Sequence, residues 1–193
     1  MKQLWKGISG LSHPVFLPLF SLLVYAPLIA KYEKDAWLLS IVWLIFAYYL
    51  LPILHFRVVR KINLLTPNLD ERRTIYRTYT IINLGFAVVS FFIISEYVAY
   101  FIGAFSLHMI LLALVSIELK ASWHSATWSF LSMVGMMVVY NIGYQDLIRP
   151  ILVPLTVLAV VCIARWRAEA HTPFELLIGI AAGALGAIPI FFI

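Results

Sequence analysis

The chain has 193 residues, of which 63% are hydrophobic and only 12% are charged, and its formal net charge is +5 at pH 7. Because a soluble domain carries charges at roughly a quarter of its positions, this chain has too few to cover a water-facing surface. The composition predicts a single integral membrane domain over residues 1–193 and excludes a soluble enzyme and a nucleic-acid-binding domain. In a membrane protein, the excess of Lys and Arg over Asp and Glu reflects either the orientation in the membrane or the binding of anionic ligands.

Long apolar runs predict an all-α fold, a polytopic bundle of six to seven membrane-spanning helices, because roughly 20 apolar residues in a helix cross the hydrocarbon layer. The expected spans, in chain order, are 14–30, 36–56, 76–95, 98–117, 122–143, 147–163 and 173–193. Only Glu96 and Tyr97 interrupt the third and fourth runs, so these form either a tight hairpin or one bent helix.

The segment 57–77 is expected to be a polar loop, since it contains Asn63, Pro67 and Asn68 among its charges. With seven spans, this loop lies on the same side of the membrane as the N-terminus and residues 118–124 and 164–172. Most basic residues fall on that side: Lys2, Lys6, Arg57, Arg60, Lys61, Arg72, Arg73, Arg77, Lys120, Arg165 and Arg167. The other side has Lys31, Lys34 and Arg149. By the positive-inside rule, the first side is cytoplasmic.

The segment 164–175 has the most informative spacing on that side. Arg165 is followed by His171 six residues later and by Glu175 four residues after that. A carboxylate one helical turn from an imidazole can bind one ring nitrogen, which fixes the tautomer and leaves the other nitrogen free to attack. Arg165 offers a planar fork for phosphate oxygens. The structural alternative is an interfacial arginine, a loop histidine and a glutamate stabilised at a helix start.

Two further segments on that side are suited to anions. Lys120, Ser122 and His124 cluster at the expected start of the fifth span, where backbone N–H groups favour an anion, and His124 could protonate a leaving oxygen. Alternatively, Ser122 is an N-cap and Lys120 an interfacial anchor. The third segment contributes Arg72 and Arg73, which otherwise form a solvated or membrane-surface patch.

At these residues the chain resembles the type 2 phosphatidic acid phosphatase superfamily, whose pattern is K-x6-R-P, then P-S-G-H, then S-R-x5-H-x3-D. The third motif, with its spacing intact, reads Ala164-Arg165-x5-His171-x3-Glu175. The second motif reads Ala121-Ser122-Trp123-His124. A short bacterial branch of the family, with K-x-S-x-H and an N-terminal His-Pro (here His13-Pro14), is more similar still.

The resemblance implies a phosphatidic acid phosphatase type 2-like bundle that hydrolyses a lipid phosphate or diphosphate through a phosphohistidine. His171 would be the nucleophile, Glu175 would orient it, and His124 would protonate the leaving group. The phosphate oxygens would be held by Arg165, Lys120, Ser122, Arg72 and Arg73. No metal or other cofactor is implied, since the cations stabilise the transferring phosphoryl group. The implied partners are a lipid phosphate substrate and membrane lipids.

The chain also departs from the family pattern. No K-x6-R-P exists, since the residue seven positions after Lys61 is Asn68. Ala164 replaces a serine, Trp123 replaces a glycine, and Glu175 is one methylene longer than aspartate. These departures leave open a catalytically inactive binder or transporter of lipid phosphates on the same scaffold.

A structural role is a further alternative. Gly179, Gly183 and Gly186 are small positions in the last expected span that favour close helix packing, and they suit a structural membrane subunit or a homo-oligomer. The expected location is a bacterial inner membrane. The charge pattern favours a cytoplasmic site, whereas family members acting on envelope lipids usually face the periplasm, so the facing stays open.

Overall fold

The computed structural model describes residues 2–16, 37–64, 67–94, 96–142 and 148–192, and in these ranges its regular elements are all helices. They are α1 (Lys2–Leu11), η1 (Pro14–Phe16), α3 (Trp37–Ile45), η2 (Phe46–Leu50), α4 (Leu51–Leu54), η3 (His55–Val59), α5 (Leu69–Ile93), α6 (Glu96–Val115), α7 (Trp123–Ile142), η4 (Ile148–Leu152), α8 (Val153–Arg167), α9 (Pro173–Gly186) and η5 (Ile188–Phe192). The all-α prediction is confirmed for these residues. Most of the expected first span, 14–30, lies outside them.

Five described segments are long and apolar enough to cross a membrane: Leu38–Val59, Leu69–Ile93, Val98–Val115, Pro150–Arg167 and Pro173–Ile190. Their outer faces carry large apolar side chains that are exposed, such as Ile81, Val88 and Phe92 on α5. A soluble protein seldom exposes so continuous an apolar surface. These side chains would be unfavourably hydrated in water, whereas lipid tails can contact them favourably. The protein is therefore an integral membrane protein.

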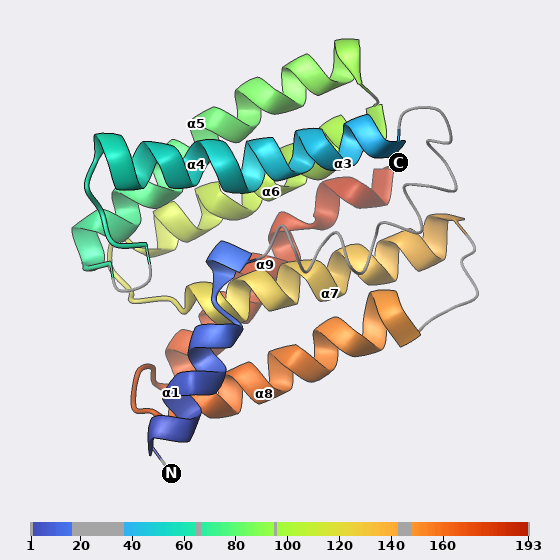
Figure 1. Cartoon of the computed structure of the whole chain (residues 1–193). Coiled ribbons are helices and arrows are strands. Elements are labelled where there is room, and N and C mark those ends of the chain that lie inside the picture. The colour runs from blue at the N-terminus through green and yellow to red at the C-terminus, as the bar shows by residue number, and fades with distance from the viewer. Residues whose placement is uncertain (1, 17–36, 65–66, 95, 143–147, 193) are drawn as a thin grey trace.

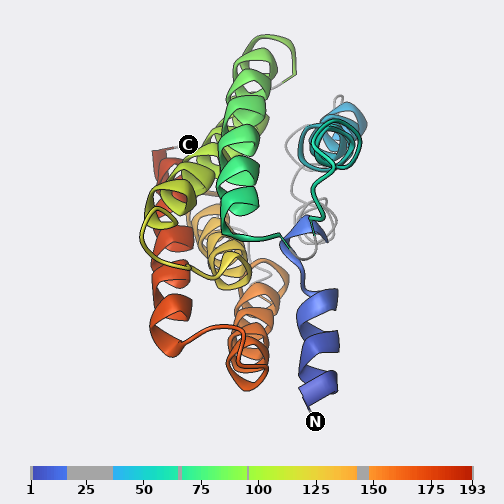
Figure 2. The same ribbon diagram turned by 90° about the vertical axis from the view of Figure 1, so that its left-hand side faces the viewer.

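Helices α5 and α6 form a hairpin, as one of the two sequence interpretations expected. Helix α5 ends at Ile93 and α6 begins at Glu96, and the two pack side by side along their length (Figures 1 and 2). The turn therefore returns the chain to the end of the bundle from which α5 started.

The prediction of a polar loop over 57–77 is wrong at both ends. Helix η3 continues to Val59, and α5 already begins at Leu69. The cause is a capping box: the Asn68 side chain accepts a hydrogen bond from the Glu71 N–H at 2.9 Å, and the Glu71 carboxylate accepts one from the Asn68 N–H at 2.7 Å. Such an arrangement satisfies two unpaired N–H groups at a helix start. It places Arg72 and Arg73 on a helix rather than in a loop.

Helix α7 lies inside the bundle, packed against α6, α8 and α9 (Figure 2). Every residue from 121 to 132 is buried, although this stretch carries several hydroxyl groups. Two of the hydroxyls bind α9: Ser125 Oγ donates to the Leu176 carbonyl at 3.0 Å, and Ser129 Oγ donates to the Ile180 carbonyl at 2.8 Å. Hydrogen bonds of this kind join helices where lipid gives no hydrophobic drive between them.

The glycines of α9 allow this close approach. A methyl group at Gly183 would overlap the Ala126 carbonyl, lying 2.8 Å from its carbon, and one at Gly179 would lie 2.6 Å from the Ser122 oxygen. One at Gly186 would lie 2.6 Å from His108 Cα on α6. The predicted close packing is confirmed, but it occurs within one chain. A homo-oligomer would therefore need a surface other than this glycine face.

The turns that carry the sequence motifs meet at one end of the bundle. Figure 1 shows α1, the start of α5, the α6–α7 connection and the α8–α9 connection at the same end, opposite the α5–α6 turn. Helix α8 extends to Arg167, beyond the expected end at 163, so Arg165 lies in its last turn. A cation there is favoured by the helix dipole.

Candidate functional site

The α8–α9 connection is short because α8 ends in a tight cap. The Ala170 N–H donates to the Arg165 carbonyl at 3.0 Å, and the Glu169 N–H donates to the Trp166 carbonyl at 2.9 Å. Glu169 has a φ of 56°, the left-handed conformation that such a cap requires. The chain then reverses within three residues and presents His171 just before α9.

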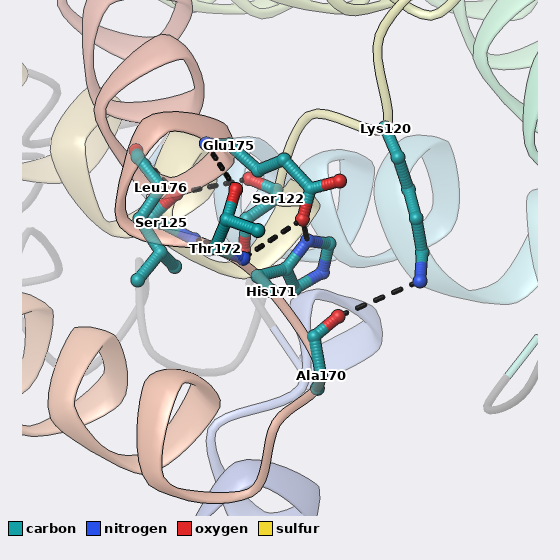
Figure 3. Close-up of polar contacts among 8 residues, drawn as sticks. All are labelled: Lys120, Ser122, Ser125, Ala170, His171, Thr172, Glu175 and Leu176. Atoms are coloured by element: carbon teal, nitrogen blue, oxygen red, sulfur yellow. Dashed lines mark hydrogen bonds and ion pairs between the residues drawn. The ribbon is translucent and has the colours of Figure 1, made fainter.

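His171 and Glu175 form the pair that the spacing predicted. Nδ1 of His171 lies 3.1 Å from Glu175 Oε2, and the same oxygen accepts a hydrogen bond from the Thr172 N–H at 3.0 Å (Figure 3). In return, Thr172 Oγ1 accepts from the Glu175 N–H at 3.2 Å, completing a capping box at the start of α9. Since a carboxylate oxygen only accepts, Nδ1 carries the proton and Nε2 keeps its lone pair.

The imidazole of His171 is held neutral. Its side chain is only 1% exposed. Burial lowers the pKa of His171 to about 4, the positive charges of Arg165 and Arg72 act in the same direction, and the hydrogen bond and charge of Glu175 oppose them. A neutral imidazole with a free Nε2 near pH 7 is a competent nucleophile.

Cations and a second histidine surround His171. Arg72 acts electrostatically on both Arg165 and His171, and Arg165 and His171 both act on His124, so these four side chains lie close together. Lys120 is near as well, because its Nζ lies 3.5 Å from the Ala170 carbonyl (Figure 3). This group of basic side chains is suited to an anion.

Ser122 takes the N-cap position that the structural alternative expected. Its Oγ accepts from the Ser125 N–H at 3.4 Å, its own N–H donates to the Glu175 carbonyl at 3.2 Å, and the residue is fully buried. Ser122 thereby joins the start of α7 to the start of α9. This contact aligns the second motif with the third.

Arg73 is directed elsewhere. Its Nε donates to the Ser116 carbonyl at 3.0 Å and its Nη2 to the Ile117 carbonyl at 2.8 Å, while Nη1 pairs with Asp70 at 3.2 Å. These carbonyls follow the end of α6, where the helix leaves acceptors unpaired. Of the two adjacent arginines, Arg73 braces α5 against α6, whereas Arg72 donates from Nε to the Pro67 carbonyl at 3.3 Å and its positive charge acts on Arg165 and His171.

Sequence reasoning missed the N-terminal contribution. Ser9 on α1 hydrogen-bonds Arg165 and lies beside His124, and the His13 ring stands edge-on to the His124 ring at 4.9 Å. The His-Pro pair was the only available signal for this region. Ser9 has no local pattern that would have marked it.

No group of three or more histidine, cysteine, aspartate or glutamate side chains suited to a metal ion occurs within the described ranges. Comparison with known protein families, with curated proteins and with solved structures finds no match. The chemistry of the site is therefore argued from its own residues.

Proposed function

We propose that this protein is a lipid phosphatase of a bacterial inner membrane that hydrolyses a lipid phosphate or diphosphate through a phosphohistidine on His171. The observation that carries the proposal is the contact between His171 Nδ1 and Glu175 Oε2 at 3.1 Å in a buried, cation-rich setting. This contact leaves Nε2 as the attacking atom. It is also the part of the sequence motif with the greatest chemical specificity.

The reaction would proceed in two displacements. In the first, the Nε2 lone pair of His171 forms a bond to phosphorus while the bond from phosphorus to the lipid oxygen breaks. The lipid oxygen takes its proton from Nδ1 of a His124 imidazolium, whose Nε2 proton stays on the Ser9 carbonyl and which the negative charge of the bound phosphate stabilises. In the second, water attacks the phosphorus and gives a proton to His124 Nδ1, the P–N bond breaks, and phosphate leaves with both His171 Nε2 and the protonated His124 restored. Arg165, Arg72 and Lys120 would stabilise charge on the transferring phosphoryl oxygens.

An apolar groove beside the site supports a lipid substrate. Helices α8 and α9 pack on α7, and between them lies a groove of about 390 Å³. It is lined by Cys162, Ile163, Trp166, Pro173, Leu176, Leu177 and Ile180. Trp166 follows Arg165 directly and Leu176 follows Glu175, so a headgroup on the cations would leave its hydrocarbon chain next to this groove.

The test is phosphate release by detergent-purified protein from phosphatidic acid, phosphatidylglycerol phosphate and a polyprenyl diphosphate, with EDTA present. Wild type should release phosphate from at least one of them. His171→Ala should abolish release, and His55→Ala, a histidine on η3 outside the site, should retain it. Acid-labile ³²P should be trapped on wild type and not on His171→Ala.

The other outcomes separate the alternatives. Binding of a lipid phosphate without release, surviving His171→Ala but weakened by Arg165→Ala, would replace this proposal with an inactive binder or transporter. Turnover by His171→Ala near the wild-type rate would overturn the phosphohistidine mechanism. A protein that neither binds a lipid phosphate nor releases phosphate from it would favour the structural-subunit alternative.

A further inference from the structure

Helix α1 reaches the site through Ser9, whose two oxygen atoms contact two different site side chains. Arg165 Nη1 donates to Ser9 Oγ at 2.7 Å, and His124 Nε2 lies 3.2 Å from the Ser9 carbonyl oxygen. Ser9 is only 4% exposed, and α1 packs against α8, which carries Arg165. One residue outside all three sequence motifs thus links a residue of the second motif to one of the third.

The contact with the Ser9 carbonyl fixes the state of His124. A carbonyl oxygen only accepts hydrogen bonds, so His124 Nε2 must carry a proton. The other ring nitrogen, Nδ1, is then unprotonated while the imidazole is neutral. The carbonyl of Ser9 therefore sets both the tautomer and the ring orientation of His124.

The contact with the Ser9 hydroxyl fixes the plane of the Arg165 guanidinium. The five N–H donors of arginine lie in a rigid planar fork, so anchoring Nη1 determines where Nε points. Nε of Arg165 is buried and has no hydrogen-bond partner among the described residues. A buried charged donor without an acceptor is unfavourable, and a bound anion would supply the missing acceptor.

The position of Ser9 is itself set by packing. The turn after α1 is held to α7, because Trp128 Nε1 donates to the Ser12 carbonyl at 3.1 Å. Ser12 Oγ donates in turn to the Ile8 carbonyl at 2.9 Å, closing the end of α1. Ser9 is thus held from the core side while Leu4 and Leu11 on α1 remain 63% and 76% exposed.

We propose that Ser9 is a positioning residue that aims Arg165 Nε at an oxygen of the substrate phosphate. Its hydroxyl holds the guanidinium in plane, and its carbonyl holds His124 beside the same phosphate. The identity of the ligand as a lipid phosphate rests on the proposed function. The arrangement of Ser9, Arg165 and His124 does not, and it predicts affinity for a phosphate-like anion whether or not turnover occurs.

The experiment measures the binding of orthovanadate, a phosphate analogue, to the full-length protein in detergent by titration calorimetry. Ser9→Ala should weaken binding about tenfold, as expected when one hydrogen bond to a charged group is lost. Ser9→Thr keeps the hydroxyl and should restore most of the affinity. Gly10→Ala, at the next position in α1 with open space around it, should bind like wild type.

A double-mutant cycle separates positioning from a general structural role. In an Arg165→Gln background, Ser9→Ala should cause no further loss of affinity, because its effect passes through the guanidinium. Equal losses in both backgrounds, unchanged affinity in Ser9→Ala, or a wild type that does not bind orthovanadate would each overturn the inference. Vanadate binding without phosphate release from any lipid would count against the proposed function alone.

Discussion

His171 and Glu175 are held together by the same carboxylate oxygen that caps the start of α9, at 3.1 Å from the ring nitrogen and 3.0 Å from the Thr172 N–H. A single position of the Glu175 carboxylate therefore both caps α9 and orients the His171 ring. We expect Glu175→Gln to lower kcat/KM by about 10²-fold or more, since orientation and proton placement contribute on that scale. Glutamine keeps an oxygen that can accept from the Thr172 N–H, and Thr172 remains the N-cap, so the free energy of unfolding should fall by less than about 1 kcal/mol. Turnover kinetics beside a thermal melt check both, and an active Glu175→Gln would show that Nδ1 needs no carboxylate.

The pH profile should report the His171 environment. In the proposed mechanism the nucleophile is the neutral imidazole, and the pKa of His171 is lowered to about 4, so kcat/KM should fall on the acid side with a midpoint near pH 4. The unfolded chain, whose imidazole titrates near 6.5, binds the proton more tightly, so the free energy of unfolding should fall as pH drops from about 6.5 toward 4. A midpoint near pH 6.5 for the acid-side fall in kcat/KM would mean that the His171 ring is exposed to water rather than buried.

The adjacent arginines should behave differently on substitution. Arg72→Ala removes a charge that acts on Arg165 and His171 and one hydrogen bond, to the Pro67 carbonyl, so KM should rise severalfold while the free energy of unfolding falls less than in Arg73→Ala. Arg73→Ala removes the donors bound to the Ser116 and Ile117 carbonyls, so the free energy of unfolding should fall by about 1–3 kcal/mol. Parallel kinetic and melting measurements test the pair. The opposite result would contradict these separate roles of Arg72 and Arg73.

Adding a methyl group at Gly183 should destabilise the contact between α7 and α9. Gly183→Ala places a methyl group against the Ala126 carbonyl, and overpacking typically costs about 1–3 kcal/mol. Gly103→Ala on α6 meets nothing within 4 Å and should be neutral or slightly stabilising, because alanine has the higher helix propensity. Unfolding in mixed micelles compares the two. A Gly183→Ala protein as stable as wild type would contradict the close approach of α7 and α9.

The groove between α8 and α9 should select for chain length. Leu177→Trp would fill part of it and should raise KM for a long-chain lipid phosphate several times more than for a short-chain, water-soluble analogue. Leu185→Trp, also exposed on α9 but absent from the groove lining, is the matched control. If Leu177→Trp raised KM equally for the long-chain and the short-chain substrate, the groove would not be a binding site for the lipid chain.

Local features of the sequence predicted the helical fold and the contact between His171 and Glu175. Apolar run lengths indicated the helices, and the i, i+4 spacing of His171 and Glu175 predicted their contact. The interruption at Glu96 and Tyr97 allowed either a hairpin or one bent helix, and the structure shows the hairpin. Ser122 at the N-cap also followed from local preference. The start of α5 was missed because the Asn68 and Glu71 capping box was interpreted as loop composition.

Long-range contacts were not predictable in the same way. Nothing in the run of adjacent arginines distinguishes Arg72 from Arg73, since only the position of the α6 carbonyls decides between them. The involvement of Ser9 depends on α1 packing against α8, some 156 residues away along the chain. The glycines of α9 were recognised as a packing face, but whether the partner is α7 or another chain depends on tertiary structure.

The buried hydroxyls of α7 bear on how the protein enters the membrane. A helix carrying Ser125, Thr127, Ser129 and Ser132 partitions into lipid less readily than its purely apolar neighbours. The Ser129 hydroxyl donates to a carbonyl of α9, and the Ser125 hydroxyl shares its donor between the local Ser122 carbonyl and one of α9, which is synthesised about fifty residues later. We expect α7 to wait at the translocation machinery until α9 emerges, and a truncated chain ending before Pro173 to integrate α7 poorly in a glycosylation-mapping assay. Efficient integration of that truncated chain would show that α7 enters lipid unaided.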